Sequence, residues 1–235
     1  MIQSSLVLDT EFRIYPHSMS FEFGDPDIFD KIYESSYWGK GSGGGSSPDA
    51  TQPYKAFLED FIRQNDIKSV VDLGCGDWQF SQFLDFGNAT YIGIDASKSV
   101  IANNQQSFSR PGVSFLNLPK KYNELPPADL LVCKDVLMHL STKGVQNILS
   151  ILPNFKYALI TNDIPCQSTF EKIPMKSRLP LPPVVNREIK TGDYRTLDPT
   201  QHPFNLELKK VFEWKGSNLI LGKECAWTKR TYLHQ

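Results

Sequence analysis

Two glycines and two carboxylates stand together directly after an apolar segment of this sequence. In Asp72-Leu-Gly-Cys-Gly-Asp-Trp78, Gly74 and Gly76 permit a sharp turn and let a ligand approach the backbone closely. Asp77 falls where the next helix is expected to begin, and a carboxylate there suits the helix dipole but repels a diphosphate. Asp72 and Asp77 therefore favour a ligand that carries ammonium and sulfonium groups. The alternative is a plain turn between a strand and a helix.

The same segment separates two nucleoside cofactors. A dinucleotide site would have a third glycine where Gln79 stands, so Gln79 and Asp77 disfavour NAD and favour S-adenosylmethionine. Asp95 ends the next apolar segment roughly 20 residues after the glycines, where a carboxylate can accept hydrogen bonds from both ribose hydroxyls. Asp95 by itself fits either cofactor.

These residues need a scaffold that brings them to one edge, and the hydrophobic pattern supplies it. Apolar residues from Tyr54 to Ile62 repeat at helical spacing, and short apolar strands then alternate with helical stretches. This alternation predicts a parallel sheet covered on both faces, which binds ligands beyond the carboxyl ends of its strands. The expected strands are 69–73, 90–94, 113–116, 129–133 and 157–161, and the expected helices are 79–86, 98–108 and 142–152.

Three segments depart from the alternation. Residues 1–50 end in a glycine- and serine-rich run from Trp38 to Ser47, which we interpret as a flexible arm or lid in front of a domain over 51–235. Seven prolines between residues 164 and 203 predict an irregular insertion near the site. Residues 206–214 and 219–228, with a turn at 215–218, predict a C-terminal antiparallel hairpin.

Three motifs together resemble the class I S-adenosylmethionine-dependent methyltransferases: Val71 to Asp77, Gly93 to Asp95, and Asp129 to His139. The resemblance runs from about Pro53 to the end of the chain. It implies a Rossmann-like, doubly wound α/β fold with a mostly parallel seven-stranded sheet and a C-terminal antiparallel hairpin. Many members have an acidic residue for the adenine amine where this chain has Asn117-Leu118, so an amide takes that place. The implied cofactor residues are Asp72, Gly74, Cys75, Gly76, Asp77, Asp95, Ala96, Asn117, Leu118 and Lys134.

The Trp38-Gly arm, together with 192–197 and 203–206, is similar to a subgroup of methyltransferases from microbial and viral surface-glycan assembly. That similarity implies a sugar hydroxyl as the methyl acceptor. Trp38 is expected to form an aromatic wall for the cofactor or the acceptor. Tyr194 and Arg195 are expected to bind acceptor hydroxyls, a carboxylate or a phosphate by directed hydrogen bonds, with an ordinary surface salt bridge as the alternative.

Methyl transfer to a hydroxyl calls for a base as well as alignment of the reacting atoms. His139 is the first candidate, because it follows the fourth expected strand and a neutral imidazole accepts a proton near pH 7. Asp135, four residues earlier, is expected to orient His139 if the segment turns helically. Asp163, after the fifth strand, is the second candidate. The alternatives are a turn cap for Asp135, packing for His139 and hydrogen bonds to turn amides for Asp163.

The composition narrows the class of protein and its partners. The chain has 235 residues, and its balance of 25 basic against 26 acidic residues disfavours a nucleic-acid-binding protein. No apolar stretch approaches the roughly 20 residues of a membrane span, and the first residues do not resemble a secretory leader. The four scattered cysteines predict reduced thiols, so we expect a cytoplasmic protein. The histidines have no ligand-spaced partners, and we assign no metal.

Two functions fit these residues. The first is an O-methyltransferase that uses S-adenosylmethionine to methylate a hydroxyl of a small molecule or a glycan. The second is a binding module of the same fold that holds the cofactor without chemistry and serves as a partner or sensor. A nicotinamide oxidoreductase is a third, disfavoured by Gln79 and Asp77. The accepting atom, the regiochemistry and the oligomeric state stay open.

Overall fold

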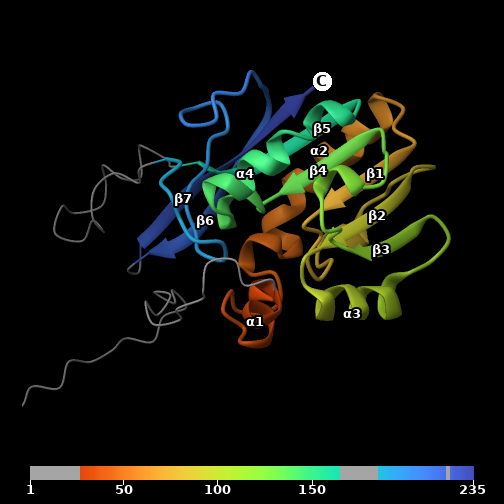
Figure 1. Ribbon diagram of the computed structural model, residues 1–235, viewed down its shortest axis with the longest axis horizontal. Coiled ribbons are helices and arrows are strands. Elements are labelled where there is room, and N and C mark those ends of the chain that lie inside the picture. Colours follow the sequence, from red (N-terminus) through yellow and green to blue (C-terminus); the bar gives the residue numbers. More distant parts are fainter. Residues whose placement is uncertain (1–26, 165–184, 221–222) are drawn as a thin grey trace, which may run out of the picture.

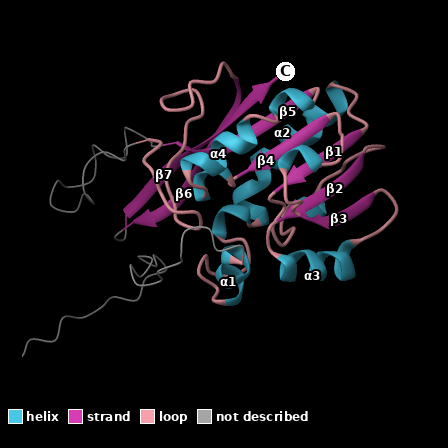
Figure 2. Cartoon of the chain, viewed as in Figure 1, coloured by secondary structure: helices cyan, strands magenta, loops and turns pink. Residues whose placement is uncertain are grey.

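The computed structural model describes residues 27–164, 185–220 and 223–235, and the side chains of 216–227 lie outside the description (Figure 1). The described residues form one seven-stranded sheet with helices packed against it (Figure 2). No helix in these ranges is long and apolar enough to cross a membrane. Cys75 and Cys133 are free thiols, whereas Cys166 and the side chain of Cys225 fall outside the described part.

The sheet has the order β3-β2-β1-β4-β5-β7-β6. Its strands are β1 (Ser69–Leu73), β2 (Thr90–Asp95), β3 (Val113–Asn117), β4 (Leu130–Lys134), β5 (Tyr157–Ile164), β6 (Lys209–Ile220) and β7 (Lys223–His234). Strands β1 to β5 pair in parallel, and β7 pairs antiparallel with both β5 and β6. The expected doubly wound fold with a terminal hairpin is confirmed. The strand order reverses between β1 and β4, which is where such sheets bind their ligands.

Helices bury apolar stripes on both faces of the sheet. They are α1 (Ile28–Glu34), α2 (Pro48–Gln64), α3 (Lys98–Phe108) and α4 (Thr142–Leu149). Successive strand residues point to opposite faces, so Val70 packs in the core beneath α2 and Val71 in the core beneath α4. A serine side chain accepts a backbone N–H at the start of α2, α3 and α4, which satisfies one otherwise unpaired donor in each.

The helix expected over 79–86 is wrong. That segment contains only a 3-10 turn at Ser81–Phe83. Trp78 has a left-handed φ of 60° and is 1% exposed, so its backbone leaves the helical path as its ring enters the core. The Gln82 side chain donates to the carbonyl oxygens of Trp78 and Gln79, which competes with helical hydrogen bonding.

The boundaries of two other expected elements also differ. Helix α2 begins at Pro48 rather than Pro53, because Ser47 caps it and proline is well tolerated in the first turn. The boundary expected after residue 50 therefore falls inside this helix. Helix α4 ends at Leu149 rather than residue 152, and a 3-10 turn that contains Pro153 follows.

The turn expected at 215–218 is wrong, although the hairpin is present. Residues 215–218 lie inside β6, and the pairing with β7 continues to Ile220 opposite Lys223. Ladder pairing overrides the turn propensity of Gly216-Ser-Asn218. In the expected insertion over 164–203, residues 165–184 lie outside the described residues, and 185–203 have no helix or strand, as expected.

Candidate active site

A cavity of about 1190 Å³ opens at the carboxyl ends of the central strands. Residues 37–47, here called the glycine arm, and Tyr194 complete its wall. Of the expected site residues, Asn117 and Arg195 lie outside the lining. The expected residues that line the cavity are Trp38, Asp72, Gly74, Cys75, Gly76, Asp77, Asp95, Ala96, Leu118, Lys134, Asp135, His139, Asp163 and Tyr194.

The turn after β1 requires its two glycines. Gly74 and Gly76 have φ angles of 81° and 57°, in the left-handed region that favours glycine. A Cβ on Gly74 would lie 2.2 Å from Cγ2 of Val136, and a Cβ on Gly76 would lie 2.2 Å from Oγ of Ser42. Protein side chains therefore occupy the space that we expected a ligand to use at these two glycines.

Two buried carboxylates face the cavity beside this turn. The carboxylate of Asp95 accepts backbone N–H groups from Gly76 and Ser97, each at 2.9 Å, and burial raises its pKa. Asp72 accepts a hydrogen bond from the Tyr91 hydroxyl at 2.7 Å, and burial raises the pKa of Asp72 to about 6. A carboxylate has about four lone-pair sites, so both groups retain acceptor capacity toward the cavity.

Asp77 holds the glycine arm against the turn. Its Oδ1 accepts hydrogen bonds from Oγ and N of Ser42 at 2.6 and 3.3 Å, and its Oδ2 accepts one from Gln79 Nε2 at 3.0 Å. Gly41 is required here because a Cβ at that position would lie 1.8 Å from Oδ2 of Asp77. No helix begins at Asp77, so the helix-dipole argument made from the sequence does not apply to it.

Trp38 of the glycine arm packs on His139. Their ring centroids are 4.8 Å apart with an interplanar angle of 40°. His139 Nδ1 lies 2.9 Å from the carbonyl oxygen of Asp193. Because a carbonyl can only accept, Nδ1 carries the proton, and Nε2 of the neutral ring is a proton acceptor. Burial lowers the pKa of His139, which keeps the ring neutral near pH 7.

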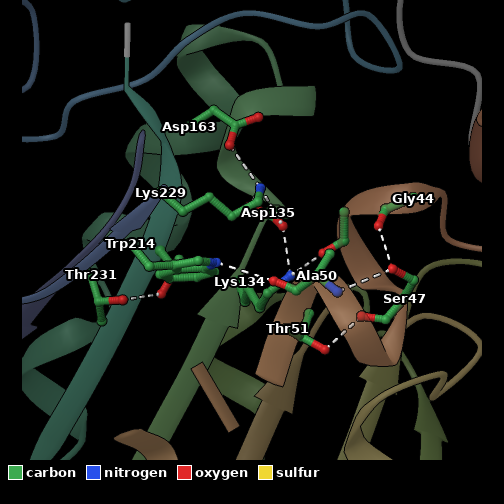
Figure 3. Close-up of polar contacts among 12 residues, drawn as sticks. Gly44, Ser47, Ala50, Thr51, Lys134, Asp135, Asp163, Trp214, Lys229 and Thr231 are labelled. Atoms are coloured by element: carbon green, nitrogen blue, oxygen red, sulfur yellow. Dashed lines mark hydrogen bonds and ion pairs between the residues drawn. The ribbon is translucent and has the colours of Figure 1, made fainter. Parts of the chain in front are cut away.

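Asp135 has partners other than the one expected. Its carboxylate accepts from Lys134 Nζ at 2.6 Å and from Lys229 Nζ at 2.9 Å to each oxygen (Figure 3). Asp135 has a left-handed φ of 58°, and His139 follows in a 3-10 turn rather than an α-helix. The carbonyl of Asp193, and not Asp135, therefore holds the imidazole of His139.

The two lysines extend this cluster in both directions. Lys134 Nζ donates to the carbonyl oxygen of Gly45 in the glycine arm at 3.2 Å. Lys229 Nζ donates to Asp163 Oδ1 at 2.7 Å (Figure 3). Burial alone would raise the pKa of Asp135, but the two ammonium groups hold it at about 2. The carboxylates of Asp135 and Asp163 raise the pKa of Lys229 although burial opposes them.

The two residues expected to bind the acceptor have different surroundings. Tyr194 lines the cavity, and its hydroxyl donates to Asp163 Oδ2 at 3.2 Å. Arg195 is 1% exposed, and its guanidinium donates to the carbonyl oxygens of Leu140 and Arg187 at 2.6 and 2.7 Å. The structure gives no support to acceptor binding by Arg195, because this residue lies outside the cavity lining and donates to backbone carbonyls of the protein.

The adenine contact expected from Asn117 also receives no support from the structure. Asn117 is exposed at the end of β3 and does not line the cavity, whereas Leu118 does. Sequence reasoning missed Lys229, Ser42 and Asp193. Lys229 lies just past the expected end of its strand, and Asp193 acts through its backbone, so residue type gave no signal for either.

No family model matches the chain, and no curated protein matches it. Many solved structures do. Magnesium protoporphyrin IX methyltransferase from Synechocystis PCC 6803 with bound SAH is 15% identical at a TM-score of 0.57, covering 89% of this chain and 98% of that one. A SAM-dependent methyltransferase from Anabaena variabilis ATCC 29413 is 14% identical with a TM-score of 0.56, and the match covers 90% of this chain and 96% of that one. An N-methyltransferase from Bradyrhizobium japonicum WM9 in complex with S-adenosyl-l-homocysteine is 10% identical with a TM-score of 0.55, and the match covers 88% of this chain and 98% of that one. The chain thus has the fold of the class I SAM-dependent methyltransferases.

Proposed function

We propose that this protein is an S-adenosylmethionine-dependent methyltransferase that methylates a hydroxyl group of a small molecule or a glycan. The observation that carries the proposal is that two buried carboxylates, Asp72 and Asp95, and His139 border the same cavity. The carboxylates suit a nucleoside amino acid, and the imidazole suits a hydroxyl acceptor.

The donor set around the turn fits this cofactor. Asp95 can accept hydrogen bonds from ribose hydroxyls, and Asp72 and Asp77 attract an ammonium group. All three repel a phosphate, which disfavours a dinucleotide. Ala96 and Leu118 line the same part of the cavity and offer apolar contact to an adenosine. When bound, the cofactor supplies a methyl group on a positively charged sulfur.

His139 is the proposed base. Its Nε2 is the proton acceptor of the neutral ring, and Trp38 packs on the imidazole and limits its freedom. A hydroxyl that donates to Nε2 becomes a better nucleophile as its proton moves to the ring. Asp163, the second candidate, already accepts hydrogen bonds from the ammonium of Lys229 and the hydroxyl of Tyr194, so fewer of its lone pairs are open to an acceptor hydroxyl. Water exclusion by the glycine arm favours the in-line displacement.

The acceptor class rests on His139 and on the sequence similarity rather than on the structural neighbours. Those neighbours include a magnesium protoporphyrin IX methyltransferase and an N-methyltransferase. A neutral imidazole in place suits an alcohol, which needs a proton acceptor during transfer. The similarity of the Trp38 arm to glycan methyltransferases is what favours a sugar among the alcohols.

Label transfer tests the proposal. The full chain is incubated with S-adenosylmethionine labelled in its methyl group and with sugar and phenol acceptors, alongside the His139→Gln variant. We expect label in a methyl ether with the wild type and a loss of about 10²- to 10⁴-fold with the variant. Calorimetry should give binding heat with S-adenosylhomocysteine and none with NADH. Binding heat with NADH would contradict the cofactor assignment.

A binding module without chemistry is the second candidate, and the closed glycine arm is the observation that favours it. Ser42 contacts both the turn at Gly76 and the carboxylate of Asp77, so protein groups of the arm take up space and hydrogen bonds at this turn. This candidate predicts that S-adenosylhomocysteine binds and that no acceptor takes up label. It also predicts that His139→Ala and Asp163→Ala leave cofactor affinity and biological activity unchanged.

A further inference from the structure

We propose that Lys229 is a positioning residue of the acceptor side of the cavity, which acts on His139 through Asp163 and the segment 193–194. The inference rests on the proposed function, in which His139 is the base. Lys229 belongs to β7, which pairs antiparallel with β5, and its side chain lines the cavity.

The ammonium group of Lys229 is held by carboxylates and is not free in the cavity. In the antiparallel pairing of β5 with β7, Lys229 stands directly opposite Asp163. Its ammonium lies 2.7 Å from Asp163 Oδ1 and 2.9 Å from both oxygens of Asp135, and its side chain is 10% exposed. An ammonium has three N–H donors, and three carboxylate oxygens surround this one. Lys229 therefore ties β4, β5 and β7 together.

Asp163 transmits this order to the segment that holds His139. Its second oxygen accepts a hydrogen bond from the Tyr194 hydroxyl at 3.2 Å. The preceding residue, Asp193, presents its carbonyl to His139 Nδ1, and Gly192 N donates to the carbonyl oxygen of His139 at 2.8 Å. The path from Lys229 to the imidazole thus consists of three polar contacts and the covalent link between Tyr194 and Asp193.

The same groups set the electrostatic field at His139. Three charged groups act on His139, namely Asp135 just after β4, Asp163 of β5 and Lys229 of β7. The ring of Tyr194, from the insertion, lies 6.0 Å from the imidazole. Loss of the Lys229 charge leaves the two carboxylates less compensated, which favours the protonated imidazole. Loss of the Asp163 charge has the opposite sign. A residue that acted only by packing would not produce opposite shifts from two neighbouring substitutions.

The test is a pH titration of ¹⁵N-labelled histidine by NMR on the full chain without cofactor. The variants are Lys229→Met, Lys229→Arg, Asp163→Asn and Tyr194→Phe. The control is Lys210→Met, since Lys210 belongs to the same hairpin and is 56% exposed in its pair with Glu213. We expect His139 to titrate at higher pH in Lys229→Met and at lower pH in Asp163→Asn. Lys229→Arg and the control should titrate like the wild type.

The nitrogen shifts also report the tautomer. We expect Nδ1–H to dominate in the wild type and Nε2–H to gain population in Tyr194→Phe, because the segment that presents the Asp193 carbonyl loses its hydroxyl tether. Unchanged titration and tautomer in the folded variants, or shifts of one sign in Lys229→Met and Asp163→Asn, would overturn the proposal. If Lys229→Met does not fold, Asp163→Asn and Tyr194→Phe decide the question.

This experiment is separate from the test of the proposed function. It contains no cofactor and no acceptor, so a wild type that transfers no label would refute the methyltransferase proposal and leave the titration to decide the role of Lys229. With an active wild type, Lys229→Met should lower kcat, leave the affinity for S-adenosylhomocysteine within about twofold, and regain most of its activity as Lys229→Arg.

Discussion

His139 and Asp193, 54 residues apart in the chain, meet through an imidazole Nδ1 and a backbone carbonyl oxygen 2.9 Å apart. This contact fixes the tautomer of the ring without any acidic side chain. Many histidine bases are oriented by a carboxylate, whereas here the nearby carboxylates are occupied by lysines. Burial lowers the pKa of His139, the proposed base, and the carbonyl, unlike a carboxylate, adds no full negative charge beside it.

The pH dependence of methyl transfer should report His139. Burial lowers its pKa below the ordinary value of 6.5, and a base works only when unprotonated. We therefore expect kcat to rise with pH through a pKa below 6.5 and to stay level up to pH 8. The profile is measured by label transfer at saturating cofactor and acceptor. The same rise in the residual activity of His139→Gln would assign the titration to another group.

Asp95→Asn should weaken cofactor binding. The amide has one oxygen in place of two, so it cannot keep both backbone N–H bonds and also accept ribose hydroxyls. Loss of charge-assisted hydrogen bonds of about 1.5–3 kcal/mol corresponds to affinity lower by roughly 10- to 150-fold. Calorimetry with S-adenosylhomocysteine measures it. Asp66→Asn, at a side chain 83% exposed, is the control that should bind like the wild type.

Ionisation of Asp72 should make the protein less stable as pH rises from 3.8 to about 6, the interval between its unfolded and folded pKa values. Burial raises the pKa of this carboxyl from 3.8 unfolded to about 6 folded, so the native state binds more protons in that interval. By linkage, the free energy of unfolding falls as pH rises through it and is level above. We expect Asp72→Asn to raise the free energy of unfolding at pH 7.5 by on the order of 2 kcal/mol, measured by urea unfolding, and to change it little at pH 4. If the variant and the wild type differed in unfolding free energy by the same amount at both pH values, the raised pKa of Asp72 would be contradicted.

Ser42→Ala should loosen the glycine arm. It removes the hydroxyl that donates to Asp77 at 2.6 Å and that lies 2.9 Å from the Tyr33 hydroxyl. A hydrogen bond to a charged group contributes about 1.5–3 kcal/mol, so amide exchange across the arm should quicken roughly 10-fold or more. Hydrogen-exchange mass spectrometry measures it. Ser150→Ala, at an exposed serine after α4, is the control and should leave exchange in the arm unchanged.

Arg195→Met should affect stability rather than acceptor binding. The substitution leaves the buried carbonyl oxygens of Leu140 and Arg187 without their donor, which costs on the order of 3 kcal/mol. We expect a lower midpoint of urea unfolding and, in the folded fraction, an acceptor KM within about twofold of the wild type. Arg63→Met, with a side chain 73% exposed, should match the wild type in both measurements. A large rise in KM with unchanged stability would restore Arg195 to the acceptor site.

The sheet could be predicted from the sequence because each strand is a short apolar run followed by a turn residue. Strand β1 and helix α3 lie at the expected residues, since buried β-branched strands and a capped helix are local signals. The helix at 79–86 failed because its fate depends on Trp78, whose ring enters a core built from distant strands. Residues 215–218 likewise form part of β6 instead of a turn because they pair with β7 across the sheet.

The candidate site was predictable where a side chain lies at or shortly after the carboxyl end of a strand. Asp72, Asp95, Lys134, His139 and Asp163 all border the cavity, because the carboxyl ends of parallel strands share one edge. The contacts among them were not predictable. Which carboxylate meets which lysine depends on the register of β7 against β5, and no local motif encodes that register.

The position of β7 as the last strand in the sequence also affects how the protein folds during synthesis. A nascent chain emerges from the ribosome with β1 to β5 far ahead of residue 229, so Asp163 is made well before its cation. The part of the cavity around Asp163 and Lys229, the proposed acceptor side, is consequently completed late in translation. Truncated chains that stop before β7 should keep a partial sheet yet lack an ordered acceptor side.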